Sequence, residues 1–119
     1  MKRQLPFLVA LTVLVCAFAN ACSARREQEA TLKQELRMMR AAIDAYTLEK
    51  QRAPQSLQDL VNDHYLKEIP TDPFTRKKDW VPRFDSVVLS PDQEATGMVD
   101  IHSNSPKASP FDGTPYNEW

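Results

Sequence analysis

The 119-residue chain is poor in glycine and histidine, and it has no cysteine beyond position 22. With only Gly97 and Gly113, it cannot form a glycine-rich loop that cradles phosphate. Cys16 and Cys22 lie within or at the end of an apolar run, so the rest of the chain can build no disulfide framework, zinc site or cysteine nucleophile. A net charge of -1 argues against nucleic acid as a partner, because phosphate binding needs a basic excess.

The two histidines do not complete a hydrolytic site. His102 lies next to Ser103 and two residues from Asp100, an order that superficially resembles a catalytic triad. Adjacent residues on a strand point to opposite faces, however, so these three side chains are not expected to converge. His64 lies among polar residues and is expected to be solvated. The chain is therefore predicted not to be an enzyme.

What the chain does have is a long apolar run at its start. Residues 5–24 are almost entirely apolar, and their number matches the approximately 20 residues that a membrane-spanning helix needs. Lys2 and Arg3 precede the run, an order typical of an export signal whose positive end stays in the cytoplasm. Everything after Arg25 is then predicted to lie in the periplasm.

Three interpretations of residues 1–24 stay open. The segment can be retained in the inner membrane as a single-pass anchor helix that continues into the next segment. It can be a cleaved signal, because Ala19-Asn20-Ala21 has the small-x-small pattern of a cleavage site. It can also be a lipoprotein signal, in which case Cys22 is lipidated. Residues 1–24 are thus a membrane anchor or signal segment, and residues 25–119 are predicted to form one periplasmic domain.

Residues 24 to about 50 are rich in strong helix formers, and a helix is predicted there. Apolar residues recur at helical spacing along one face of it, at Leu32, Leu36, Met39, Ile43 and Tyr46. This stripe either covers a small sheet in its own domain or packs on neighbouring subunits in a helical bundle, with Leu32, Leu36, Met39 and Ile43 as an assembly face. On the exposed face, Arg40 stands four residues from Asp44 and is expected to pair with it.

The pattern changes after Pro54. Ser56, with Asp59 three residues on, resembles a capping box and predicts a short helix over residues 57–66. Residues 69–74 contain two prolines and predict a rigid turn, because each proline biases its predecessor away from the helical region.

Three β-prone segments follow, at residues 80–84, 86–90 and 98–102. Residues 103–119 predict a loop that its aromatic residues pin to the core. The predicted fold class is α+β, with a long N-terminal helix packed on a small antiparallel sheet of about three strands and a short second helix.

The second half of the chain is acidic, which suits a hard cation better than a polyanion. Residues 79–119 contain seven acidic residues and only two basic ones. Calcium takes about six to eight oxygen ligands. Candidate oxygen donors are Asp100, Ser103, Asn104, Ser105, Asp112 and Asn117. Because their spacing is irregular, the alternative is that they are turn-forming residues and solvated acids.

Several motifs within residues 24–119 resemble those of the G-type major pseudopilins of type II secretion systems. The most specific match covers residues 65–74, where a "lysine-x-leucine or isoleucine-proline-x-aspartate-proline" pattern is followed by an aromatic residue. The other similar segments are the helix signature at residues 41–46, Ala53-Pro54 with residues 56–60, the Asp-Ile-His-Ser strand at residues 100–103, and Trp119.

The resemblance implies a pilin-like fold and a structural subunit of a secretion pseudopilus. Such a subunit is attached to the inner membrane and assembles through its apolar helix with copies of itself and with other secretion-system proteins. The resemblance also implies a calcium site in the C-terminal loop, with Asp112 as one carboxylate ligand and Ser103 nearby. Asp112, Ser103 and Asp100 are therefore the candidate calcium ligands.

The chain departs from the family pattern at two places. It has no glycine before position 97 and no acid in its apolar run, so the usual prepilin-peptidase site and the helix glutamate are missing. Asn104-Ser105-Pro106-Lys107 stands where the family has its first tail aspartate, which implies a weakened or differently built metal site. The alternative function is an envelope lipoprotein that uses a pilin-like head as a binding module.

Overall fold

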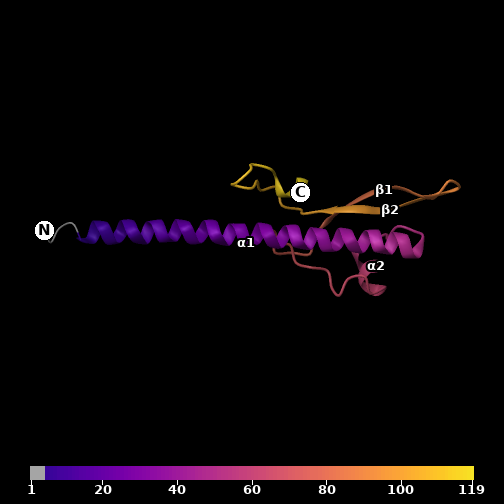
Figure 1. Ribbon diagram of the computed structural model, residues 1–119, viewed down its shortest axis with the longest axis horizontal. Coiled ribbons are helices and arrows are strands. Elements are labelled where there is room, and N and C mark those ends of the chain that lie inside the picture. Colours follow the sequence, from indigo (N-terminus) through magenta and orange to yellow (C-terminus); the bar gives the residue numbers. More distant parts are fainter. Residues whose placement is uncertain (1–4) are drawn as a thin grey trace. The chain divides into compact units, whose positions relative to one another are not determined.

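The computed structural model describes residues 5–119, with side chains from Phe7 onward, so the predicted role of Lys2 and Arg3 falls outside the described residues. Helix α1 runs without interruption from Leu5 to Lys50 (Figure 1). It contains no glycine, and no proline after its second residue, so no residue in its interior kinks or interrupts it. The predicted helix is confirmed, and it is continuous with the apolar run.

The chain divides into two compact units, residues 1–30 and residues 31–119. We call the second unit the head. The predicted division into residues 1–24 and 25–119 concerns processing and location, and it stays a prediction.

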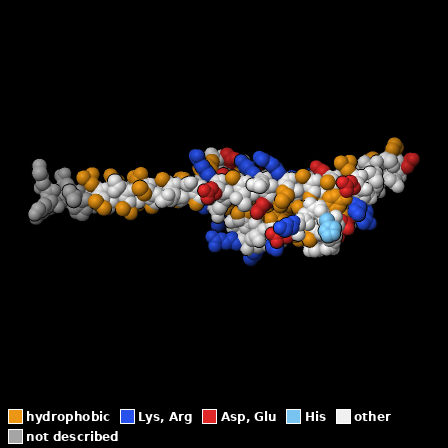
Figure 2. Space-filling view, turned by 60° about the horizontal axis from the view of Figure 1, so that its bottom comes forward, with side chains coloured by type: hydrophobic (Ala, Val, Ile, Leu, Met, Phe, Trp, Pro, Cys, Tyr) orange, Lys and Arg blue, Asp and Glu red, His pale blue; other side chains and the backbone are white. Residues whose placement is uncertain are grey.

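Between Phe7 and Phe18, α1 carries apolar side chains on all sides, apart from Thr12. The large apolar side chains between Phe7 and Phe18 are 55–79% exposed. Figure 2 shows hydrophobic side chains along this part of the helix, with no Lys, Arg, Asp or Glu among them. The Thr12 hydroxyl donates to the main-chain oxygens of Leu8 and Val9, at 3.1 and 2.8 Å, so its polar group is satisfied within the helix. This part of α1 is long and apolar enough to cross a membrane.

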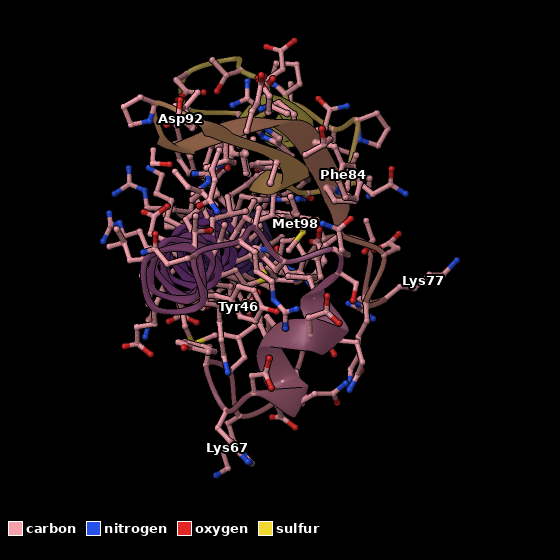
Figure 3. The ribbon with its side chains drawn as sticks, turned by 90° about the vertical axis from the view of Figure 1, so that its right-hand side faces the viewer. Tyr46, Lys67, Lys77, Phe84, Asp92 and Met98 are labelled. Atoms are coloured by element: carbon pink, nitrogen blue, oxygen red, sulfur yellow. The ribbon has the colours of Figure 1, made fainter. Side chains whose placement is uncertain are left out.

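The head consists of the end of α1, helix α2 (Leu57–Asn62), strands β1 (Val81–Ser90) and β2 (Gln93–His102), and the 3-10 turn η1 (Tyr116–Glu118). In Figures 1 and 3, the sheet lies on one side of α1 and α2 on the other. The α+β class, with a long helix, a short helix and an antiparallel sheet, is as predicted.

The sheet differs in detail from the prediction, because among residues 5–119 it has two strands and not three. β1 pairs with β2 antiparallel from Val81 opposite His102 to Ser90 opposite Gln93. β1 continues through Asp85, the residue between two of the predicted β-prone segments, and the Asp85 side chain accepts a hydrogen bond from the Ser86 N–H. The two β-prone segments at residues 80–84 and 86–90 are therefore one strand.

Helix α2 begins as predicted and ends four residues earlier. The Ser56 hydroxyl accepts the Asp59 N–H at 3.3 Å and caps the helix. His64 has a φ of 66°, a left-handed conformation that an α-helix cannot contain. The chain therefore turns after Asn62, and the main-chain N–H of Tyr65 donates to the Leu60 oxygen at 2.8 Å.

The apolar stripe of α1 forms one wall of the head's core. Leu32 and Met39 are fully buried, and Leu36 and Ile43 are 2% exposed. They pack with buried residues of the sheet and loops, among them Leu60, Leu66, Trp80, Met98, Ile101 and Tyr116. Figure 3 shows Met98 between the sheet and α1. The stripe thus covers the head's own sheet, as the first of the two interpretations predicts. The assignment of Leu32, Leu36, Met39 and Ile43 as an assembly face stays a prediction, and within one chain these four side chains are already occupied by the core.

Candidate functional site

Arg40 joins α1 to the end of β2 and to Trp119. Its Nε donates to Asp100 Oδ1 at 2.7 Å. Its Nη2 donates to the main-chain oxygens of Ile101, at 3.0 Å, and Trp119, at 2.7 Å. The four-residue spacing of Arg40 and Asp44 suggested that these two residues pair, but Arg40 instead pairs with Asp100. One guanidinium therefore holds three oxygens that lie at least 60 residues away in the sequence.

His102 closes these contacts into a ring. Its Nδ1 lies 2.7 Å from the Trp119 oxygen, and its Nε2 lies 3.4 Å from Asp100 Oδ2. Arg40, Asp100, His102 and Trp119 thus each contact two others of the set; we call these four residues the Arg40 ring. Burial raises the pKa of Asp100, but the Ile101 N–H and the Arg40 guanidinium outweigh burial and hold this pKa below its ordinary value. Asp100 is therefore a carboxylate inside the ring.

Ser103, the second predicted calcium ligand, contacts the turn at residues 69–74 and not the Arg40 ring. Its buried hydroxyl donates to Asp72 Oδ2. Asp72 is also fully buried, and its other oxygen accepts the N–H groups of Phe74 and Thr75, at 2.8 and 3.3 Å. This carboxylate fixes the turn that the two prolines predict at residues 69–74, and Ser103 ties β2 to that turn.

Asp112, the third predicted ligand, lies at the surface of the C-terminal loop. Its Oδ1 accepts the Thr114 N–H at 2.9 Å and the Thr114 hydroxyl at 2.7 Å. The Thr114 hydroxyl in turn accepts Trp119 Nε1–H at 2.8 Å. Hydrogen bonds from Thr114 are the main cause of a lowered Asp112 pKa, and the charge of Lys33 contributes. Lys33 Nζ also lies 4.8 Å from the centre of the Trp119 ring.

The three predicted calcium ligands are not brought together. Asp100 contacts Arg40, Ser103 contacts Asp72, and Asp112 contacts Thr114. Within the described part of the chain, no three His, Cys, Asp or Glu side chains are grouped so that they could hold a metal ion. A pocket of about 350 Å³ beside the Arg40 ring has three cationic side chains and one acid in its wall, at Lys33, Arg37, Arg40 and Asp112. This donor set does not fit calcium.

The comparison with known proteins gives no identification. No protein family, curated protein or solved structure matches the chain significantly. The site and the function therefore have to be argued from the residues themselves.

The contacts around His102 and Ser103 do not form a triad. His102 lies close to Asp100, but the Ser103 hydroxyl is buried and donates to Asp72. The ring nitrogens of His102 are both used within the Arg40 ring. The sequence-based expectation that these residues do not converge on a nucleophile agrees with this placement.

Glu35 is a functional candidate that the sequence did not single out. Its Oε2 is buried and has no hydrogen-bond partner. Burial, and then the charge of Asp72, raise the pKa of Glu35 to about 7. The signal in the sequence was its place on α1, immediately before Leu36 of the buried stripe.

Cys22, the candidate lipidation site, is exposed on α1 within the first unit, as is Cys16. Both thiols are free. Cys22 follows Ala19-Asn20-Ala21 inside the uninterrupted helix, so all three interpretations of residues 1–24 remain compatible with its position.

Proposed function

We propose that the protein is a non-enzymatic structural subunit of a type II secretion pseudopilus or a close derivative, attached to the inner membrane by α1 with its head in the periplasm. The observation that carries this proposal is α1 itself. One uninterrupted helix has an exposed apolar part at residues 7–18 and, further along, an apolar stripe buried in the core of a small α+β head. The resemblance of the head's motifs to those of pseudopilins also supports the proposal.

The exposed part of α1 needs an apolar environment. A helix that is hydrophobic on every side is stable in a bilayer or among other helices. A subunit that passes from a membrane into a filament meets both environments in turn, and an all-round apolar surface suits both. We call residues 7–24 the stem.

Contacts between copies would use the stem, because the stripe from Leu32 to Ile43 is occupied by the head's own core. Two further apolar side chains of α1 remain available in the head. Met38 is 46% exposed and Leu48 is 73% exposed. They offer secondary contacts once stems have gathered.

Photocrosslinking tests this assembly. The full chain is produced in a Gram-negative inner membrane with p-benzoylphenylalanine at Val13 or Phe18, which are 63% and 66% exposed. We expect ladders of crosslinked copies, because neighbouring stems lie side by side in a filament. The same probe at Lys67, which is exposed and points away from the core in Figure 3, is the matched control. Stem probes that yield only uncrosslinked chain would contradict the proposal.

A second candidate is an envelope lipoprotein that uses the head as a binding module. Two observations favour it: the exposed Cys22 directly after a small-x-small sequence, and a polar pocket of about 530 Å³ in the head. Arg52 and Asp63 both lie in the wall of this pocket and form no ion pair with each other. Mass spectrometry of the mature N-terminus separates the candidates. A diacylated Cys22 supports the lipoprotein, and retained residues 1–24 support the anchored subunit.

A further inference from the structure

The Arg40 ring gathers the kind of oxygens that a calcium ion would gather. The acceptors are one carboxylate oxygen of Asp100 and the main-chain oxygens of Ile101 and Trp119. Carboxylate and carbonyl oxygens are the ligands that calcium prefers in proteins. In this head, the positive charge that lies among these three oxygens is the guanidinium of Arg40 on α1.

Arginine is suited to this position. Its guanidinium is always charged and presents five donors in a rigid plane, so one side chain can serve several acceptors at fixed angles. The Arg40 and Asp100 side chains are 34% and 25% exposed, so water competes with their contact only in part. A metal ion at the same oxygens would lie against the guanidinium charge, and the two cations would repel each other.

The second predicted carboxylate ligand has a cation of its own. Hydrogen bonds from Thr114 are the main cause of the lowered Asp112 pKa, and the charge of Lys33 lowers this pKa further. Lys33 also lies over the Trp119 ring. Lys33 and Arg40 are seven residues apart on α1, about two helical turns, so they lie on the same side of the helix. Arg40 thus interacts with Asp100, and Lys33 with Asp112. These two acids are the carboxylates that were predicted to bind calcium.

We propose that Arg40, assisted by Lys33, fastens the C-terminal segment of the head to α1 in place of a metal ion, so that the head folds and keeps its C-terminal segment ordered without calcium. The inference concerns the head alone and does not depend on whether the protein assembles into a filament. It replaces the calcium dependence that the family resemblance implied.

The first test is thermal unfolding of the purified full chain in mild detergent, followed by tryptophan fluorescence. Trp119 belongs to the Arg40 ring and Trp80 lies in the core, so both report on the head. Samples contain either excess EGTA or millimolar calcium chloride. We expect the same Tm in both, because a ligand stabilises a protein only if the native state binds it. A Tm several degrees higher in calcium would overturn the inference.

The second test removes the guanidinium. Arg40→Met keeps most of the length of the side chain but removes the hydrogen bonds that the guanidinium donates to Asp100, Ile101 and Trp119. We expect the Tm to fall by about 5–10 °C, with or without calcium. Arg37→Met, one turn earlier and exposed, is the matched control and should melt like the wild type. If Arg40→Met does not fold, Arg40→Lys provides the same comparison, because lysine keeps the charge but not the planar set of donors. An Arg40→Met or Arg40→Lys variant that melts like the wild type would overturn the inference.

Discussion

Gly97 lies so close to Ala53 that a Cβ atom on it would stand 2.3 Å from the Ala53 Cβ. This approach lets the chain that precedes α2 run along the outer edge of β2. The Met98 N–H donates to the Pro54 oxygen at 2.7 Å, and the Gln55 side chain donates to the Thr96 oxygen at 3.0 Å. One edge of the two-stranded sheet is thereby covered, which protects it from pairing with another strand.

We expect Gly97→Ala to destabilise the head. The added methyl group collides with Ala53, and relief requires the main chain to move, which typically costs about 1–3 kcal/mol. Urea unfolding of the full chain in detergent measures the change. Ser86→Ala, an exposed substitution on the neighbouring strand, should leave the unfolding midpoint unchanged. Equal midpoints for the two variants would show that the edge is not tightly packed.

Leu36 and Leu48 provide a test of which part of α1 belongs to the core. Leu36 is 2% exposed and Leu48 is 73% exposed, on the same helix. Leu36→Ala should lower the free energy of unfolding by about 2–5 kcal/mol, because it leaves a cavity. Leu48→Ala should have little effect. If Leu36→Ala proved as stable as the wild type but lost crosslinks between copies, the stripe would be an assembly face after all.

Glu35 should make the stability of the head depend on pH. Its folded pKa of about 7 lies above its ordinary value of 4.5, so the head binds this proton more tightly than the unfolded chain does. The stabilisation is complete below pH 4.5 and is lost as the pH rises to about 7. Above that range a charged Glu35 remains beside Asp72, without a partner for Oε2.

Glu35→Gln removes this charge. We expect the variant to be more stable than the wild type near pH 8, by on the order of 1 kcal/mol, and the difference to shrink or reverse near pH 5. Thermal melts at the two pH values measure it. Glu68→Gln, an exposed carboxylate in the loop after α2, should show no such dependence. Parallel pH profiles for the wild type and Glu35→Gln would mean that Glu35 is solvated.

Ser103→Ala tests the buried contact between β2 and the proline-containing turn. Without the hydroxyl, Asp72 loses one hydrogen bond to an oxygen that water cannot reach. We expect a loss of about 1–3 kcal/mol in the free energy of unfolding. Because Asp72 holds the N–H groups of Phe74 and Thr75, hydrogen exchange of these two amides should also become faster. Unchanged exchange would show that the turn is held by its prolines alone.

Local features of this fold could be predicted from sequence. The stripe from Leu32 to Tyr46 has a spacing that places every member on one face, and Ser56 with Asp59 marks where α2 starts. These signals work because they depend on residues three or four positions apart. The division of residues 80–90 into two β-prone segments was wrong, because a polar residue such as Asp85 does not have to end a strand that is exposed to solvent.

The ring around Arg40 could not be predicted in the same way. Arg40 and Asp100 are separated by 60 residues, and four-residue spacing favoured Asp44 as the partner. Likewise, an apolar stripe shows that a face is buried but not whether it is covered by its own sheet or by another chain. Which of the two covers the stripe depends on where β2 and the C-terminal segment pack. A pattern of residues three or four positions apart does not predict this packing.

Labelling of Cys16 tests the central claim most directly, that the apolar part of α1 anchors the mature protein in a membrane. Cys16 is exposed on the stem, so only its surroundings can protect it from a polar maleimide. In inner-membrane vesicles of a Cys22→Ser variant, the account predicts that Cys16 is retained, stays unlabelled, and reacts only after detergent is added. Rapid labelling in intact vesicles, or a mature protein that lacks Cys16, would contradict it.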